Sequence, residues 1–147
     1  MPKVPGFAIA PGANPIAAPV DWVDPPPRLD NFYGTRVCAV DVDGNEVAGI
    51  RLPPIAVPLG THTGWNVYRA QPGELADRDG SLIPFARTGK QREAAGDPRP
   101  SLEERYGSRE AYVAKVKAAA EALVAERLLL PADAAAYAAA AEERDQL

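Results

Sequence analysis

The prolines restrict this chain more than any other residue type, because each proline fixes a backbone dihedral and removes a hydrogen-bond donor. Of the 16 prolines, 11 lie in the first 60 of the 147 residues. Alanine has the opposite distribution, with 15 in the last 47 residues. The sequence therefore predicts one domain, or a fragment of one, of the α+β class, with an irregular first part and a helical last part.

Residues 1–34 are predicted to form an extended arm, because their prolines, including the run at 25–27, exclude helix and central strand. The arm is too apolar for a solvated linker, so we expect it to dock on a surface. A tail without a fixed position is the alternative. The apolar side chains are Phe7, Ile9, Ile16, Val20, Trp22, Phe32 and Tyr33.

Residues 35–59 predict a β-hairpin. Two runs rich in β-branched residues lie on either side of the Asp-Gly-Asn sequence at 43–45, and Asp-Gly is typical of a tight turn. The Pro-Pro pair at 53–54 is expected to end the second strand, and residues 55–59 are expected to continue extended.

Residues 60–100 predict a long, loop-rich segment, because glycines and prolines interrupt it throughout. Short turns of helix fit around residues 73–76 and 90–95. This segment separates the predicted hairpin from the helical part, residues 101–147.

The last part predicts a short helix followed by a pair of longer ones. Ser101 and Glu104 match a capping box, and Gly107 is expected to end the short helix. Ser108 is expected to cap a helix that runs to about residue 128, and Pro131 to begin another that runs to about residue 144. The first of the two has an apolar stripe with helical spacing: Val113, Val116, Ala120, Leu123 and Leu128.

Charge and composition exclude several classes of function. The net charge of −4 gives no electrostatic footprint for nucleic acid or an anionic membrane, and we expect neither as a partner. One cysteine rules out an internal disulfide framework and a cysteine-rich zinc site. No stretch has the pattern of a signal peptide or of a membrane span, and an unpaired cysteine suits the cytosol.

The sequence shows no catalytic or cofactor motif. It contains no G-x-S-x-G, no P-loop and no G-x-G-x-x-G, so we predict no cofactor and no phosphate site. The acidic sequence at 41–46 lacks the spacing of an EF-hand, and a hairpin turn accounts for it better than a calcium site. The charged runs at 77–79 and 103–105 are interpreted as solvated, and no metal ligands are predicted.

His62 is the only histidine, and a catalytic role for it requires a nucleophile within reach, for which Cys38 is a candidate. Nothing around Cys38 is activating, so we interpret it as a small core residue. His62 lies in a segment with Trp65 and Asn66, and these three residues are the candidate substrate or docking surface. No residue is predicted to be catalytic.

Several ordered motifs resemble the C-terminal region of the large bacterial "alpha/beta hydrolase domain-containing" proteins. The resemblance covers about residues 36–145 and, more loosely, residues 4–6. The motifs are the sequences at 40–53, 63–66, 80–88 and 96–106, and the sequence at 119–124 followed by Leu129, Leu130 and Pro131.

The resemblance implies that this chain is a portion of a larger α/β-hydrolase fold. In that family the nucleophile elbow and the catalytic histidine lie upstream of the matching region. The sequence Gly60-Thr61-His62 is similar to a catalytic Gly-Thr-x-His loop, but relatives usually have tyrosine at this place in the segment. The resemblance therefore brings no catalytic residue to this chain.

Three interpretations remain open. The chain is the C-terminal segment of a hydrolase, with a structural or site-covering role and no activity alone; its partner is then the hydrolase core or another copy of the chain. Alternatively, it is a free-standing accessory protein that docks through its proline-rich arm and helix stripe. In the third, it is a minimal enzyme that uses His62 with Cys38 or an aspartate.

Overall fold

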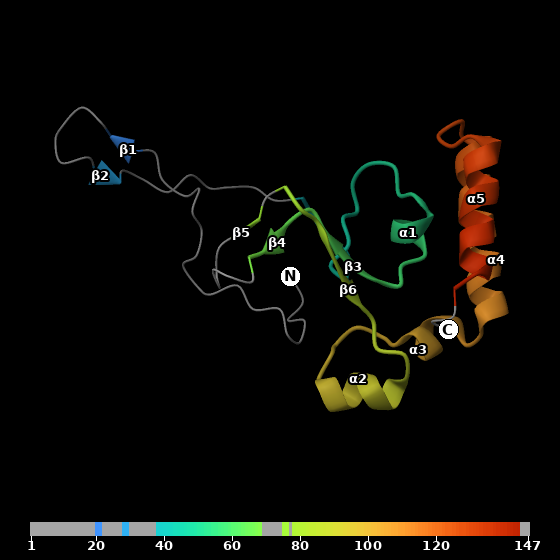
Figure 1. Ribbon diagram of the computed structural model, residues 1–147, viewed down its shortest axis with the longest axis horizontal. Helices are drawn as coiled ribbons and strands as arrows, with labels where there is room; N and C mark the ends of the chain where they lie inside the picture. The colour runs from blue at the N-terminus through green and yellow to red at the C-terminus, as the bar shows by residue number, and fades with distance from the viewer. Residues whose placement is uncertain (1–19, 22–27, 30–37, 69–74, 77, 145–147) are drawn as a thin grey trace.

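The computed structural model describes residues 20–21, 28–29, 38–68, 75–76 and 78–144. These residues form a mixed α/β structure of short strands and helices (Figure 1). The strands form three antiparallel pairs: β1 (Val20–Asp21) with β2 (Arg28–Leu29), β3 (Gly60–Thr63) with β6 (Ser81–Pro84), and β4 (Asn66–Val67) with β5 (Leu75–Ala76). The helices are α1 (Pro53–Ala56), α2 (Gly89–Ala95), α3 (Leu102–Tyr106), α4 (Arg109–Ala125) and α5 (Pro131–Glu142).

The three predicted C-terminal helices are confirmed, with their predicted caps. The Ser101 side chain accepts from the Glu104 amide, and the Glu104 carboxylate accepts from the Ser101 amide, which completes the capping box of α3. Gly107, at φ 72°, ends that helix in a conformation that favours glycine. Ser108 caps α4, and Pro131 is in the first turn of α5.

The core lies where α4 meets α5, α1 and the segment before β3. Helices α4 and α5 run side by side as a hairpin (Figure 1). Ala120 and Ala141 are almost fully buried, and small side chains allow the backbones to approach closely. The apolar cluster consists of Val57, Leu59, Phe85, Leu102, Tyr112, Val116 and Ala141. Val116 and Ala120 of the predicted stripe are thus buried, whereas Leu128 at its end is exposed.

The predicted hairpin is reduced to one tight turn. A single bridge joins Val40 and Glu46, and no ladder extends from it among the described residues. The reason is local, because the Asp41 carboxylate accepts from the amides of Asp43 and Asn45 and closes the turn on itself. Gly44 has φ 85°, as an Asp-Gly turn requires.

The prediction that residues 55–59 are extended is wrong for Ile55 and Ala56, which lie in α1. Pro53 and Pro54 start α1 instead of only ending a strand, because their fixed φ suits the first turn of a helix. The amides of Ile55 and Ala56 both donate to the Leu52 carbonyl. The turn of chain that α1 makes brings residue 57 back toward the core.

The segment at 60–100 is more regular than predicted. The helical turn around 90–95 is confirmed by α2, which Thr88 caps. The turn around 73–76 is wrong at Leu75–Ala76, which form β5, and residues 73–74 lie outside the described residues. β3 and β6 pair in register from Gly60 opposite Pro84 to Thr63 opposite Ser81, an interaction between residues about 20 apart that local patterns do not reveal.

Of two further predictions, one is wrong and the other is tested only in part. Cys38 is exposed, so its interpretation as a core residue is wrong. Most of the predicted arm at 1–34 lies outside the described residues, and the described pieces, β1 and β2, are extended but paired with each other. Proline-free stretches between the prolines are long enough for such a two-residue pair.

Candidate functional site

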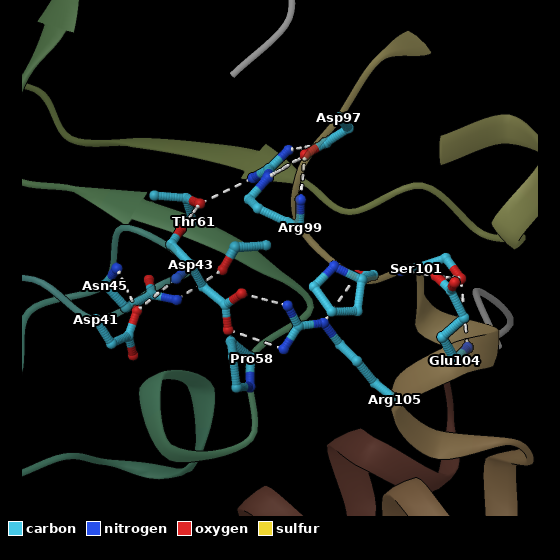
Figure 2. Close-up of polar contacts among 12 residues, drawn as sticks. Asp41, Asp43, Asn45, Pro58, Thr61, Asp97, Arg99, Ser101, Glu104 and Arg105 are labelled. Atoms are coloured by element: carbon cyan, nitrogen blue, oxygen red, sulfur yellow. Dashed lines mark hydrogen bonds and ion pairs between the residues drawn. The ribbon is translucent and has the colours of Figure 1, made fainter. Parts of the chain in front are cut away.

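Two features of the described residues bring polar side chains together: a buried network of charges and an apolar pocket. The network joins three segments that are distant in the sequence, the turn at 41–45, the β3–β6 pair and the segment at 97–105 (Figure 2). The pocket lies on the other side of β3, against α4 and α5.

Asp43 and Arg105 form the first half of the network. The two terminal guanidinium nitrogens of Arg105, Nη1 and Nη2, donate to the two carboxylate oxygens of Asp43, and the side chains are only 16% and 9% exposed. Two parallel bonds of this kind are the strongest ion-pair geometry that proteins use. The interpretation of residues 103–105 as a solvated run is therefore wrong for Arg105.

Asp97 and Arg99 form the second half. The guanidinium of Arg99, 2% exposed, donates to Asp97 Oδ1 at 2.9 Å and to Asp97 Oδ2 at 2.6 Å. Its Nη1 also donates to Thr61 Oγ1 at 2.8 Å. These hydrogen bonds from Arg99 hold the pKa of the Asp97 carboxyl below its usual value.

Phe85 lies between the two pairs. The guanidinium carbon of Arg105 is 4.1 Å from the centre of the Phe85 ring, and that of Arg99 is 5.0 Å away. Cations over an aromatic face are attracted by its quadrupole, so the ring helps to offset the burial of two positive charges. The network has its hydrogen-bonding groups paired internally, which is the arrangement of a scaffold rather than of a reactive centre.

The hydroxyl groups serve structural roles as well. Ser101 and Ser108 cap α3 and α4, and Ser81 shares a hydrogen bond with Thr63, 2.6 Å between their hydroxyl oxygens. Thr61 donates to the Asp43 carbonyl. The carboxylates of the acidic turn are paired with Arg51 and Arg105.

The three residues of the predicted surface lie in two successive strands and the link between them. His62 is half-buried in β3, and its amide donates to Asn45 Oδ1 at 2.8 Å. Asn66 is in β4, where its side-chain oxygen accepts from the Val67 amide at 2.8 Å, and Trp65 is half-buried before it. Only His62 lines the pocket.

The pocket has a volume of about 170 Å³. His62 lines its edge, beside the Pro54 carbonyl. Burial is the main cause of a lowered His62 pKa, the Pro54 hydrogen bond opposes it, and the positive charge of Arg144 lowers it further. The lining residues are Pro53, Pro54, Val57, Leu59, His62, Leu82, Tyr112, Val116, Tyr137, Ala140, Ala141 and Arg144.

Sequence reasoning missed the helical residues that complete this pocket. Tyr137, Ala141 and Arg144 lie on one face of α5 and its end, at the i, i+4, i+7 spacing that a helical face requires. That spacing is visible in the sequence. The sequence does not show which element this face contacts, because β3 and α5 come together only through tertiary packing.

The described residues contain no group of three or more histidine, cysteine, aspartate or glutamate residues that could hold a metal ion. Their helices also include none that is both long and apolar enough to cross a membrane.

Comparison with known families agrees with the resemblance seen in the motifs. A family model described as an alpha/beta hydrolase domain matches residues 7–139, which is most of the chain. No curated protein and no solved structure matches. The chain belongs to the alpha/beta hydrolase domain family.

Proposed function

We propose that this chain is the non-catalytic C-terminal segment of a bacterial hydrolase of this family, and that residues 40–52 pack against the catalytic part. In that role it supplies structure or covers the substrate site, and it does not hydrolyse substrate alone. The observation that carries the proposal is the exposure of large apolar side chains along one short, fixed segment.

Five large apolar residues of this segment are exposed: Val40 by 37%, Val42 by 86%, Val47 by 46%, Ile50 by 55% and Leu52 by 36%. Single exposed apolar residues are ordinary, but several in one short segment are typical of an interaction surface. Burying these side chains against a partner would contribute up to roughly 1.5 kcal/mol each, and least for Val40 and Leu52, which have the smallest exposed fractions.

Ion pairs and a buried hydrogen bond fix the segment at residues 40–52 to the rest of the structure. Asp41 pairs with Arg51 at 2.8 Å within the segment, and Asp43 pairs with Arg105 from α3. The Asn45 side chain, fully buried, donates to the Gly60 carbonyl at 3.2 Å. A surface that is already ordered loses little conformational entropy on binding, which favours its use as a docking face.

The first experiment tests activity. The purified chain, with and without the protein encoded directly upstream, is assayed with p-nitrophenyl esters. We expect no turnover above buffer for the chain alone, and turnover when an upstream partner with a G-x-S-x-G elbow is present. Turnover by the chain alone that is lost in His62→Ala would favour a minimal enzyme instead.

The second experiment tests the surface. In a pull-down with the same partner, the Val42→Ser/Ile50→Ser variant should bind at least tenfold more weakly, because two apolar contacts are lost. Leu130→Ser is the matched control, since Leu130 is 67% exposed but lies far along the chain, before α5. Weakening by Leu130→Ser alone would instead favour an accessory protein that docks through its helices.

A further inference from the structure

The pocket beside His62 has a character that the proposed packing role does not explain. It lies between α1, β3, α4 and α5, and none of the exposed apolar residues at 40–52 lines it. One part of its lining is apolar and the other carries a single permanent charge. The apolar part restricts the size of a group that fits the pocket, and the charged part restricts its chemistry.

The apolar part sets the size of the ligand. Val57, Leu59, Val116 and Ala141 are all less than 10% exposed and form its floor. A volume of about 170 Å³ is close to the roughly 150 Å³ of an engineered apolar cavity that stays dry and binds benzene. A benzene-sized apolar group therefore fits the floor.

The charged part sets the chemistry. Arg144 follows the end of α5 at the rim, and within the described residues its guanidinium makes no ion pair. Its positive charge reaches His62 and Tyr112: burial lowers the His62 pKa and Arg144 lowers it further, whereas burial raises the Tyr112 pKa and Arg144 opposes that rise. The lining that the structure describes contains no aspartate or glutamate. The site is thus complementary to an anion.

His62 and the tyrosines make the site selective rather than merely positive. The His62 imidazole is part of the lining, beside the Pro54 carbonyl. Tyr112 and Tyr137 contribute ring surface together with hydroxyl groups, which donate readily to a carboxylate. Arginine is suited to a carboxylate because its planar fork matches the two oxygens.

We propose that this pocket binds a small monocarboxylate whose apolar tail is about the size of a benzene ring, with the tail on the floor and the carboxylate at Arg144. The inference does not depend on the proposed packing role, because binding is measured on the full chain alone. Failure of either proposal can therefore be distinguished from failure of the other.

The test uses His62, which as the only histidine gives one unambiguous set of imidazole signals by NMR. The full chain is titrated at pH 7.5 with benzoate and, separately, with benzyl alcohol, which has a similar shape but no charge. We expect a saturable shift with benzoate and at least tenfold weaker binding of benzyl alcohol. This difference is the part that Arg144 supplies, since hydrogen bonds to charged groups are the stronger ones.

Two variants and one control assign the binding to the pocket. Arg144→Gln should weaken benzoate binding about tenfold and leave benzyl alcohol unchanged, because only the carboxylate contact is lost. Ala140→Leu should weaken both, since Ala140 is exposed at the rim and a larger side chain fills the opening. Arg127→Gln is the charge control, because Arg127 does not line the pocket.

The outcomes that overturn the proposal are distinct. The absence of a saturable His62 shift with either compound excludes the pocket as a binding site. Equal binding of benzoate and benzyl alcohol, or an equal effect of Arg127→Gln and Arg144→Gln, excludes the specific carboxylate contact. The backbone NMR spectrum of each variant, recorded on the same samples, shows that it is folded.

Discussion

Asp43 and Arg105 are 62 residues apart in the sequence, and each is an ordinary charged residue by its neighbours. Asp43 belongs to an acidic turn and Arg105 to a charged helix end. Their pairing is buried: the Phe85 ring lies against the Arg105 guanidinium, and Thr61 of β3 donates to the Asp43 carbonyl. Burial of an ion pair costs desolvation, so its contribution depends on both partners being present.

We predict that Arg105→Met destabilises the protein strongly. The variant keeps the apolar stem but leaves the Asp43 carboxylate buried without a cation, which costs about 3 kcal/mol. The free energy of unfolding in urea measures this loss. Adding Asp43→Asn to the variant should recover part of the lost stability, because the unpaired charge is removed.

The matched control is Lys117→Met, which breaks an ion pair of 2.7 Å between Lys117 and Glu142. These side chains are 46% and 55% exposed, so we expect a change of less than about 1 kcal/mol. Similar losses in Arg105→Met and Lys117→Met would contradict a special role for the buried pair.

Among the elements, the helices followed their local signals and the hairpin did not. The caps at Ser101, Ser108 and Pro131 act over one helical turn, so the residues that decide them are adjacent in the sequence. The β-rich runs at 36–42 and 46–52 require a partner surface as well as a turn. With Val42 and Ile50 exposed, the structure gives them no such surface.

We predict that the two serine caps differ in strength. Ser101→Ala should cost about 1–2 kcal/mol, because Ser101 is fully buried and its capping box also involves Glu104. Ser108→Ala should cost about 0.5–1 kcal/mol, because Ser108 is exposed and satisfies one amide of α4. Thermal unfolding of both variants measures the difference, and a larger loss for Ser108→Ala would contradict it.

For the molecule as a whole, we predict two separate losses of stability on acidification. One comes from His62 in β3 and the other from Asp97 in the charge network. Burial makes folded His62 bind its proton more weakly than the unfolded chain does, so stability falls as the pH drops through the ordinary value of 6.5. The Asp97 pKa is also lowered, from 3.8, and its contribution is present above that value and lost below it.

Urea unfolding between pH 8 and pH 3 tests this pattern. We expect His62→Gln to remove the loss that begins near neutral pH and to leave the loss below about pH 4. Burial is the largest cause of the lowered His62 pKa. The Pro54 carbonyl raises this pKa, and the charge of Arg144 lowers it. A loss of stability near pH 6 that persists in His62→Gln would contradict the assignment.

The candidate pocket could be predicted only in part. His62 was singled out because it is the only histidine, and it does line the pocket, but Trp65 and Asn66 do not. Tyr112, Tyr137 and Arg144 were missed, although their helices were predicted. Their contribution depends on which face of α4 and α5 meets β3, and no local pattern contains that information.

The amino-acid sequence by itself determines the caps and lengths of the helices, the turn at Asp43–Asn45 and the family, since these depend on short-range hydrogen bonds or on motif order. Tertiary structure alone decides that Arg99 and Arg105 are buried, that β3 pairs with β6 and that His62 meets Arg144. The physical reason is that burial and ion pairing depend on the surfaces that distant segments bring together. The meaning of a charged residue therefore changes with its partner, whereas a helix cap acts on amides within its own turn.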